Sequence, residues 1–144
     1  MRNRIIAALA LILGGSALLT GCSSLDGVLH KQSTNTFEDV DAFRADASVD
    51  VPWMPEDATA ITLRTSTLKD AADAVVLLSS AASLPGECVE VARTSAPAWD
   101  LEGSPSPYEA ATVSVCGEWS VIPAEDGWFG WTPNSEDEQR AALS

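Results

Sequence analysis

Histidine and basic side chains are scarce in this sequence. The chain holds one histidine, His30, and eight Lys or Arg residues against 21 Asp or Glu, for a formal net charge of −13. General acid–base and nucleophilic catalysis need a tuned proton acceptor, most often histidine. The residue patterns of hydrolase elbows, zinc proteases, phosphate loops and EF-hands do not occur either. The sequence therefore predicts a protein that is not an enzyme and uses no metal or cofactor.

The sequence also lacks an apolar run of the length that crosses a bilayer, which is about 20 residues. Its longest apolar stretch, residues 5–19, is shorter and follows the basic residues Arg2 and Arg4. Small residues then follow at Thr20 and Gly21. The order of charged, apolar and small residues is typical of a secretory signal peptide. We expect residues 1–21 to be an export signal.

The signal ends in LTGC, residues 19–22, and this tetrapeptide resembles the lipobox of bacterial lipoproteins. The resemblance implies that cleavage occurs before Cys22 and that the Cys22 thiol carries a diacylglyceryl group. The protein would then be anchored to the extracytoplasmic face of the cell membrane, because two acyl chains suffice for stable attachment. The alternatives are an ordinary signal peptide cleaved near Gly21 and, less favoured, an uncleaved anchor helix.

Removal of residues 1–21 makes the remaining chain more acidic. Six Lys or Arg residues are then left against 21 Asp or Glu, a side-chain balance of −15. Such a surface repels nucleic acids and anionic headgroups, so we expect no nucleic-acid partner. It suits either a cationic partner or the simpler role of a solvated acidic coat.

Cysteine is rare as well, with three residues in the chain. Once Cys22 is assigned to lipid, Cys88 and Cys116 remain as a pair in an exported, oxidising context. Neither belongs to a CxxC motif or has a nearby histidine. We therefore predict a structural disulfide between Cys88 and Cys116.

Composition divides the mature chain into three parts. Residues 22–50 are predicted to be an acidic, flexible tether in which Thr36 and Asp39 fit a capping box. A short helix or turn there would dock Phe37, Val40 and Phe43 on the domain. Residues 51–133 are predicted to be the globular domain, and the polar tail, residues 134–144, is expected to fray.

The body of the chain carries mostly strand signals. Alternating or continuous apolar runs predict strands at residues 60–65, 74–80 and 111–116. The Asp-Gly pair at 126–127 predicts a hairpin before a last strand. Residues 66–76 fit either a helix or a loop, and we favour the loop. The expected fold is a β-rich α+β domain with one small, mostly antiparallel sheet.

Aromatic residues gather near the end of the chain. Alternation along a strand would place Phe129 and Trp131 on one face and Trp128 on the other. These residues are expected either to form the core or to present a contact surface, with at least one partly exposed. The candidate contact residues are Tyr108, Trp119, Trp128, Phe129 and Trp131.

The segments WMPEDAT, CGEWSVIP and DGWFGWTPNSEDE are similar to segments of small lipoproteins of actinobacteria. This resemblance implies one compact domain behind a lipobox and implies no activity. The sequence thus predicts a lipid-anchored envelope protein that serves as an interaction module for another envelope protein or a cell-wall component. A binder of small ligands or glycans that uses the C-terminal tryptophans is the alternative.

Overall fold

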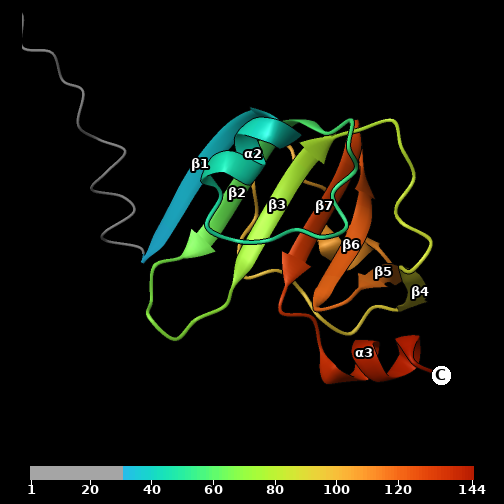
Figure 1. The fold of residues 1–144 in the computed structure, drawn as a ribbon. Helices are drawn as coiled ribbons and strands as arrows, with labels where there is room; N and C mark the ends of the chain where they lie inside the picture. Colours follow the sequence, from blue (N-terminus) through green and yellow to red (C-terminus); the bar gives the residue numbers. More distant parts are fainter. Residues whose placement is uncertain (1–30) are drawn as a thin grey trace, which may run out of the picture.

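The computed structural model describes residues 31–144, and the predicted signal peptide and Cys22 lie outside the described residues. These residues form one antiparallel sheet with strand order β1-β2-β3-β7-β6-β5-β4 and two helices (Figure 1). The prediction of a β-rich α+β domain is confirmed. The strands are β1 (Gln32–Asp39), β2 (Thr59–Ser66), β3 (Ala74–Ser79), β4 (Val89–Ala92), β5 (Thr112–Cys116), β6 (Trp119–Ala124) and β7 (Gly127–Thr132). The helices are α2 (Val40–Asp46) and α3 (Glu136–Ala142), and Pro107–Glu109 form a 3-10 turn.

The sheet begins earlier in the chain than the sequence predicted. We expected a tether up to residue 50, but residues 32–39 form β1 and pair antiparallel with β2 along its length. Thr36 therefore lies in a strand and caps no helix. The N-cap of α2 is Asp39, whose carboxylate accepts a hydrogen bond from the Ala42 N–H at 2.9 Å. The strand escaped prediction because most of its side chains are exposed, so it carries no alternating apolar pattern.

Helix α2 docks on the sheet as the spacing of its apolar residues predicted. Val40 and Phe43 are buried, and Phe37 of β1 packs edge-on against Phe43 with ring centroids 5.1 Å apart. A seven-residue helix is too short to be stable alone in water, so this packing holds it in place.

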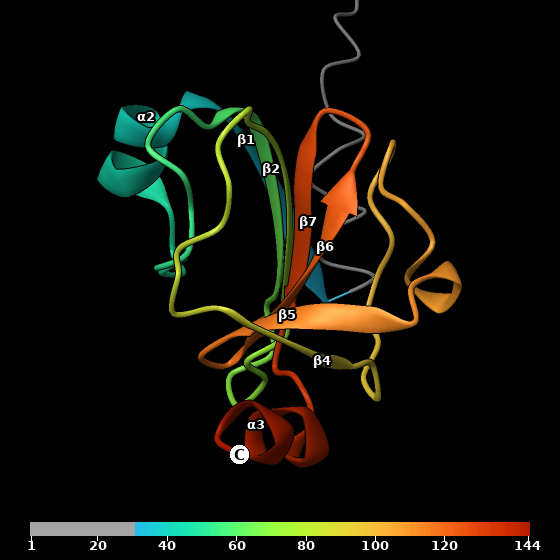
Figure 2. The ribbon, with the colours of Figure 1, turned by 90° about the vertical axis from the view of Figure 1, so that its right-hand side faces the viewer.

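Both faces of the sheet are covered, which explains the continuous apolar run of β3 from Ala74 to Leu78. One face lies under α2 and the loop that follows it, and the loop between β4 and β5 covers the other (Figure 2). Along β3, Val76 and Leu78 belong to the core on the α2 side, while Val75 belongs to the core on the opposite side. A strand buried on both faces needs apolar residues at every position.

The core on the α2 side is built around Trp53. Its indole is 1% exposed and packs against Trp119, with ring centroids 5.9 Å apart. Gly130 of β7 makes room for this ring, because a Cβ at that position would lie 2.4 Å from Trp53 Cζ2. Trp53 therefore lies inside the core.

One loop and one hairpin match their sequence signals. Residues 67–73 connect β2 and β3 without a helix, as favoured. The β6–β7 hairpin forms, with Glu125 and Asp126 as its turn residues and Gly127 paired with Ala124. Gly127 is required there because a Cβ would lie 2.2 Å from the Leu78 carbonyl oxygen.

The predicted disulfide is present. Cys88 and Cys116 are joined with an S–S distance of 2.08 Å and a Cα–Cα distance of 4.5 Å. The bridge lies next to the Val89–Val115 pair of β4 and β5. It ties the last strand of the sheet to its neighbour.

The C-terminal tail is a helix rather than a frayed end. Ser135 and Glu138 form a capping box at the start of α3. The Glu138 side chain is fully buried and accepts hydrogen bonds from the segment after β4 and from β6. These long-range bonds order a segment whose composition alone is polar. No helix within residues 31–144 is both long and apolar enough to span a bilayer.

Candidate binding groove

Most of the aromatic residues proposed from the sequence as a contact surface lie in the core. Trp119, Phe129 and Trp131 are 4%, 0% and 1% exposed. Phe129 and Trp131 share one face of β7, as alternation predicted. Because covering segments lie over both faces of the sheet, these three residues are unavailable to a partner in this structure. Of the two roles expected for these three residues, core packing is the one that the structure shows.

The other two candidates are more accessible. Trp128 is half-buried, and its indole Nε1 donates to the Ala82 carbonyl at 3.0 Å, which fixes the segment after β3. Tyr108 is 74% exposed and lies beside the Arg93 guanidinium, 5.4 Å from the ring centroid. The two side chains belong to different sides of the sheet, since Trp128 packs against the α2-side core. They do not form one aromatic surface.

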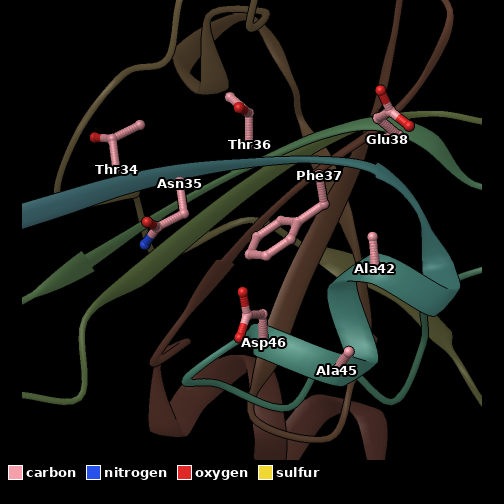
Figure 3. Close-up of a pocket in the computed structure, with 8 residues that line it drawn as sticks. All are labelled: Thr34, Asn35, Thr36, Phe37, Glu38, Ala42, Ala45 and Asp46. Carbon is pink, nitrogen blue, oxygen red and sulfur yellow. The ribbon is translucent and has the colours of Figure 1, made fainter.

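A groove lies elsewhere, between the free edge of β1 and helix α2 (Figure 3). We call it the β1–α2 groove. Its volume is about 640 Å³. Its lining residues come from both elements: Thr34, Asn35, Thr36, Phe37, Glu38, Ala42, Ala45 and Asp46.

Small residues on α2 keep this groove open. Ala42, Ala45 and Asp46 lie on one stripe of the helix and are exposed, whereas Val40 and Phe43 point into the core. On the opposite wall, Asn35 and Phe37 project from β1 toward the helix (Figure 3). Phe37 is half-buried and gives the groove an apolar surface beside polar walls.

The edge of β1 at this groove pairs with no strand among residues 31–144. β1 is the first strand in the sheet order, and within that range β2 is its one strand neighbour. The Thr67 N–H donates to the Lys31 carbonyl at 2.8 Å. This bond shows that Lys31, and with it every second residue of β1, directs its backbone groups toward β2. In an antiparallel ladder every second residue directs its N–H and C=O away from the partner. By that register the backbone groups of Gln32, Thr34 and Thr36 point toward the free edge.

The two edges of the sheet differ in their protection. Strand β4, at the other edge, has four residues, contains Glu90 and is flanked by Glu87 and Arg93. Strand β1 has eight residues and carries no charge, proline or bulge from Gln32 to Phe37. Proteins normally blunt exposed edges with short strands, charges or proline because a free edge recruits other strands. The β1 edge is left open.

The groove is negatively charged. Glu38 and Asp46 are its charged lining residues, and Asp41 is exposed in the first turn of α2. The nearby Arg44 is engaged elsewhere, since its guanidinium donates to both carboxylate oxygens of Glu56, one of them at 3.0 Å. That hydrogen-bonded pair raises the pKa of Arg44 and lowers the pKa of Glu56. Arg44 is thus directed to Glu56, while Arg64 contacts the lining residue Thr34, with its Nε donating to Thr34 Oγ1 at 2.9 Å.

Residues 31–144 contain no cluster of His, Cys, Asp and Glu that could hold a metal ion. Cys22, the predicted lipidation site, lies outside these residues. Comparison with protein-family models, curated proteins and solved structures found no match.

Sequence reasoning missed the groove because its parts look like a linker. The run QSTNTF at residues 32–37 is polar, yet threonine favours strands. That enrichment was the available signal. The alanines at 42 and 45 form no motif in the sequence. Their role, which is to leave the groove open, becomes visible when α2 is placed beside β1.

Proposed function

We propose that this protein is a lipid-anchored protein of the cell envelope that binds another exported polypeptide through the β1–α2 groove. It acts as an interaction module rather than as an enzyme. The observation that carries the proposal is the unprotected edge of β1 beside an open groove. The buried positions of Trp119, Phe129 and Trp131 weigh against the alternative of a glycan-binding aromatic face.

The location rests on the sequence before residue 31. The lipobox-like LTGC supports attachment through Cys22, and nine residues, 23–31, separate that cysteine from β1. The Cys22→Ala variant is expected to move from the membrane to the soluble or secreted fraction. Intact mass of the membrane-extracted wild-type protein should show loss of residues 1–21 and a diacylglyceryl adduct. An unmodified thiol at Cys22 would refute the anchor.

The interaction is tested separately, in intact cells. A photoreactive p-benzoylphenylalanine replaces Ala45 in the groove, and the control carries it at Glu125, an exposed turn residue. We expect crosslinks to an exported polypeptide from position 45 and none from position 125, with the contact mapped by mass spectrometry. Equal crosslinking from both positions, or none from position 45, would rule out the groove as the contact surface.

A further inference from the structure

We propose that the occupant of the β1–α2 groove is an extended, positively charged peptide segment that adds to β1 as an eighth strand. This inference rests on the proposed function and names the class of partner. Strand addition to a sheet edge is a common mode of peptide recognition, in which backbone hydrogen bonds give affinity and side-chain pockets give specificity.

The backbone of β1 supplies the hydrogen bonds. Thr34 and Thr36 each direct an N–H and a C=O toward the free edge by the register of the β1–β2 ladder. Both residues are exposed. An edge of eight residues offers a length of about 27 Å at the rise of an antiparallel strand.

The groove supplies the side-chain selection. Alternate side chains of an added strand would point toward α2, next to Asn35 and Phe37. The facing stripe of the helix is small at Ala42 and Ala45 and acidic at Asp46. A peptide whose basic residues occupy the alternate positions that face α2 matches these walls, because the ammonium groups lie near Asp46 and their aliphatic stems pack against Phe37.

Charge selects a cationic peptide over a second copy of the chain. The groove carries Glu38 and Asp46 and no basic residue. The whole chain has a net charge of −13, so two copies repel each other before their β1 strands meet. A Lys- or Arg-rich segment is instead attracted over the whole approach.

The test uses the full-length protein extracted from membranes in detergent and a fluorescein-labelled heptapeptide, KVKVKVK, with blocked ends. Binding is followed by fluorescence anisotropy. Two control peptides separate the contributions: EVEVEVE reverses the charge, and KVKVKVK with alternate N-methyl groups keeps the charge but loses N–H donors. We expect the first peptide to bind and each control peptide to bind at least about tenfold more weakly. For the N-methylated peptide, a tenfold loss corresponds to the loss of about one to three hydrogen bonds.

Matched protein variants locate the site. Thr36→Pro removes an N–H that faces the free edge, so it leaves the β1–β2 ladder intact and should weaken binding by about tenfold. Thr36→Ala keeps that N–H and should bind within about twofold of wild type.

Asp46→Asn should weaken binding by about threefold, whereas Glu125→Gln, with the same charge change three strands away, should not.

Amide hydrogen exchange on the wild-type protein tests the same point without a variant that can misfold. The peptide should slow exchange at the Thr34 and Thr36 amides and leave the β4 amides unchanged. Strand addition would be overturned if the N-methylated peptide bound as tightly as the unmodified one, or if Thr36→Pro bound the peptide as tightly as wild type. A dimer formed through β1 would overturn it as well. Protection of β1 without peptide, lost when residues 23–30 are deleted, would assign the edge to the chain's own N-terminal segment.

The two proposals fail separately. Crosslinking from position 45 to a partner segment that lacks basic residues would leave the groove as the contact surface and disprove a cationic strand. Peptide binding in detergent with no crosslink in cells would disprove the proposed function alone.

Discussion

At the scale of single residues, Glu138 is the side chain with the widest structural role. It accepts hydrogen bonds from the N–H groups of Thr94 and Ser95, both at 2.7 Å, and from Ser120 Oγ at 2.6 Å. Ser95 Oγ adds another at 2.7 Å and itself accepts from Trp131 Nε1 at 2.9 Å. The carboxylate joins α3, β6 and the start of the β4–β5 loop, and it is held by amides and hydroxyls rather than by a cation.

Glu138→Gln is predicted to destabilise the protein by about 2–3 kcal/mol, because an amide cannot accept from every donor and leaves buried N–H or O–H groups unpaired. Urea unfolding at pH 7 measures this change. The control, Glu136→Gln, alters an exposed residue of the same helix and should change stability by less than about 0.5 kcal/mol. Equal stability of wild type and Glu138→Gln would contradict the role assigned to the carboxylate.

The same carboxylate makes stability depend on pH. Burial alone would raise the pKa of Glu138, but the hydrogen bonds from Ser120, Ser95 and the backbone outweigh it and lower the pKa. Its contribution is therefore complete above about pH 4.3, the ordinary glutamate value, and is lost as pH falls through the lowered folded-state pKa. The stability gap between wild type and Glu138→Gln should therefore stay constant above about pH 5 and narrow as the pH falls below about 4.3.

At the scale of elements, the two edge strands are stabilised by different means. β1 pairs along eight residues with β2 and is followed by the docked helix α2. β4 has four residues and depends on its pairing with β5, on the neighbouring α3 and on the disulfide. A short strand at an exposed edge gains most from a covalent link.

Removing the disulfide with the double variant Cys88→Ala and Cys116→Ala is predicted to lower the free energy of unfolding by about 3.6 kcal/mol, the chain-entropy value for a loop of 28 residues. Urea unfolding measures the change. Wild-type protein treated with a reductant should unfold at nearly the same urea concentration as the variant. A loss below about 1 kcal/mol would mean that strand pairing alone holds β4.

At the scale of the whole molecule, the sheet is the frame and irregular segments complete the core on both of its faces. In this arrangement Trp53, Trp119 and Trp131 pack in the core. The surface is acidic, and the β1–α2 groove lies at one edge of the sheet. The chain enters the sheet at Lys31, directly before β1. An anchor at Cys22 would therefore place the open edge close to the membrane, since nine residues span at most about 32 Å when fully extended.

That closeness is a prediction of its own, conditional on the proposed anchor. In vesicles that contain a dansylated lipid, the lipidated protein should transfer energy from its tryptophans to the dansyl group. A Gly/Ser insertion of about 20 residues between Ser24 and Leu25 should reduce the transfer, because a Gly/Ser segment is itself a flexible coil and increases the distance between anchor and domain. Transfer that is unchanged by the insertion would show that the domain contacts the membrane independently of linker length.

Prediction from sequence succeeded where the signal was local and failed where it came from a distant partner. An apolar run predicted β3, and an Asp-Gly pair predicted the β6–β7 hairpin. The disulfide was predicted because two cysteines remain once Cys22 is assigned to lipid in an exported chain. β1 lacks such a pattern because it is an edge strand with exposed side chains. The capping box of Ser135 and Glu138 was a readable signal for α3, but the polar composition of the tail obscured it.

The candidate site was harder to predict than the fold. The aromatic residues were the conspicuous choice, yet covering loops bury Trp119, Phe129 and Trp131. The β1–α2 groove combines a polar strand with a small-residue helix stripe, and neither is distinctive alone. The groove forms between β1 and α2, so it could be recognised only when the positions of both elements were known.

By itself the sequence determined the acidic charge, the strand-rich class, the docked apolar residues of α2 and the cysteine pairing, since each follows from residue type and spacing along the chain. The tertiary structure alone decided which tryptophans are buried, which strand is the open edge and what holds the tail. Those features depend on which segments cover the sheet and which strands become neighbours, and contacts between residues far apart in the chain settle both.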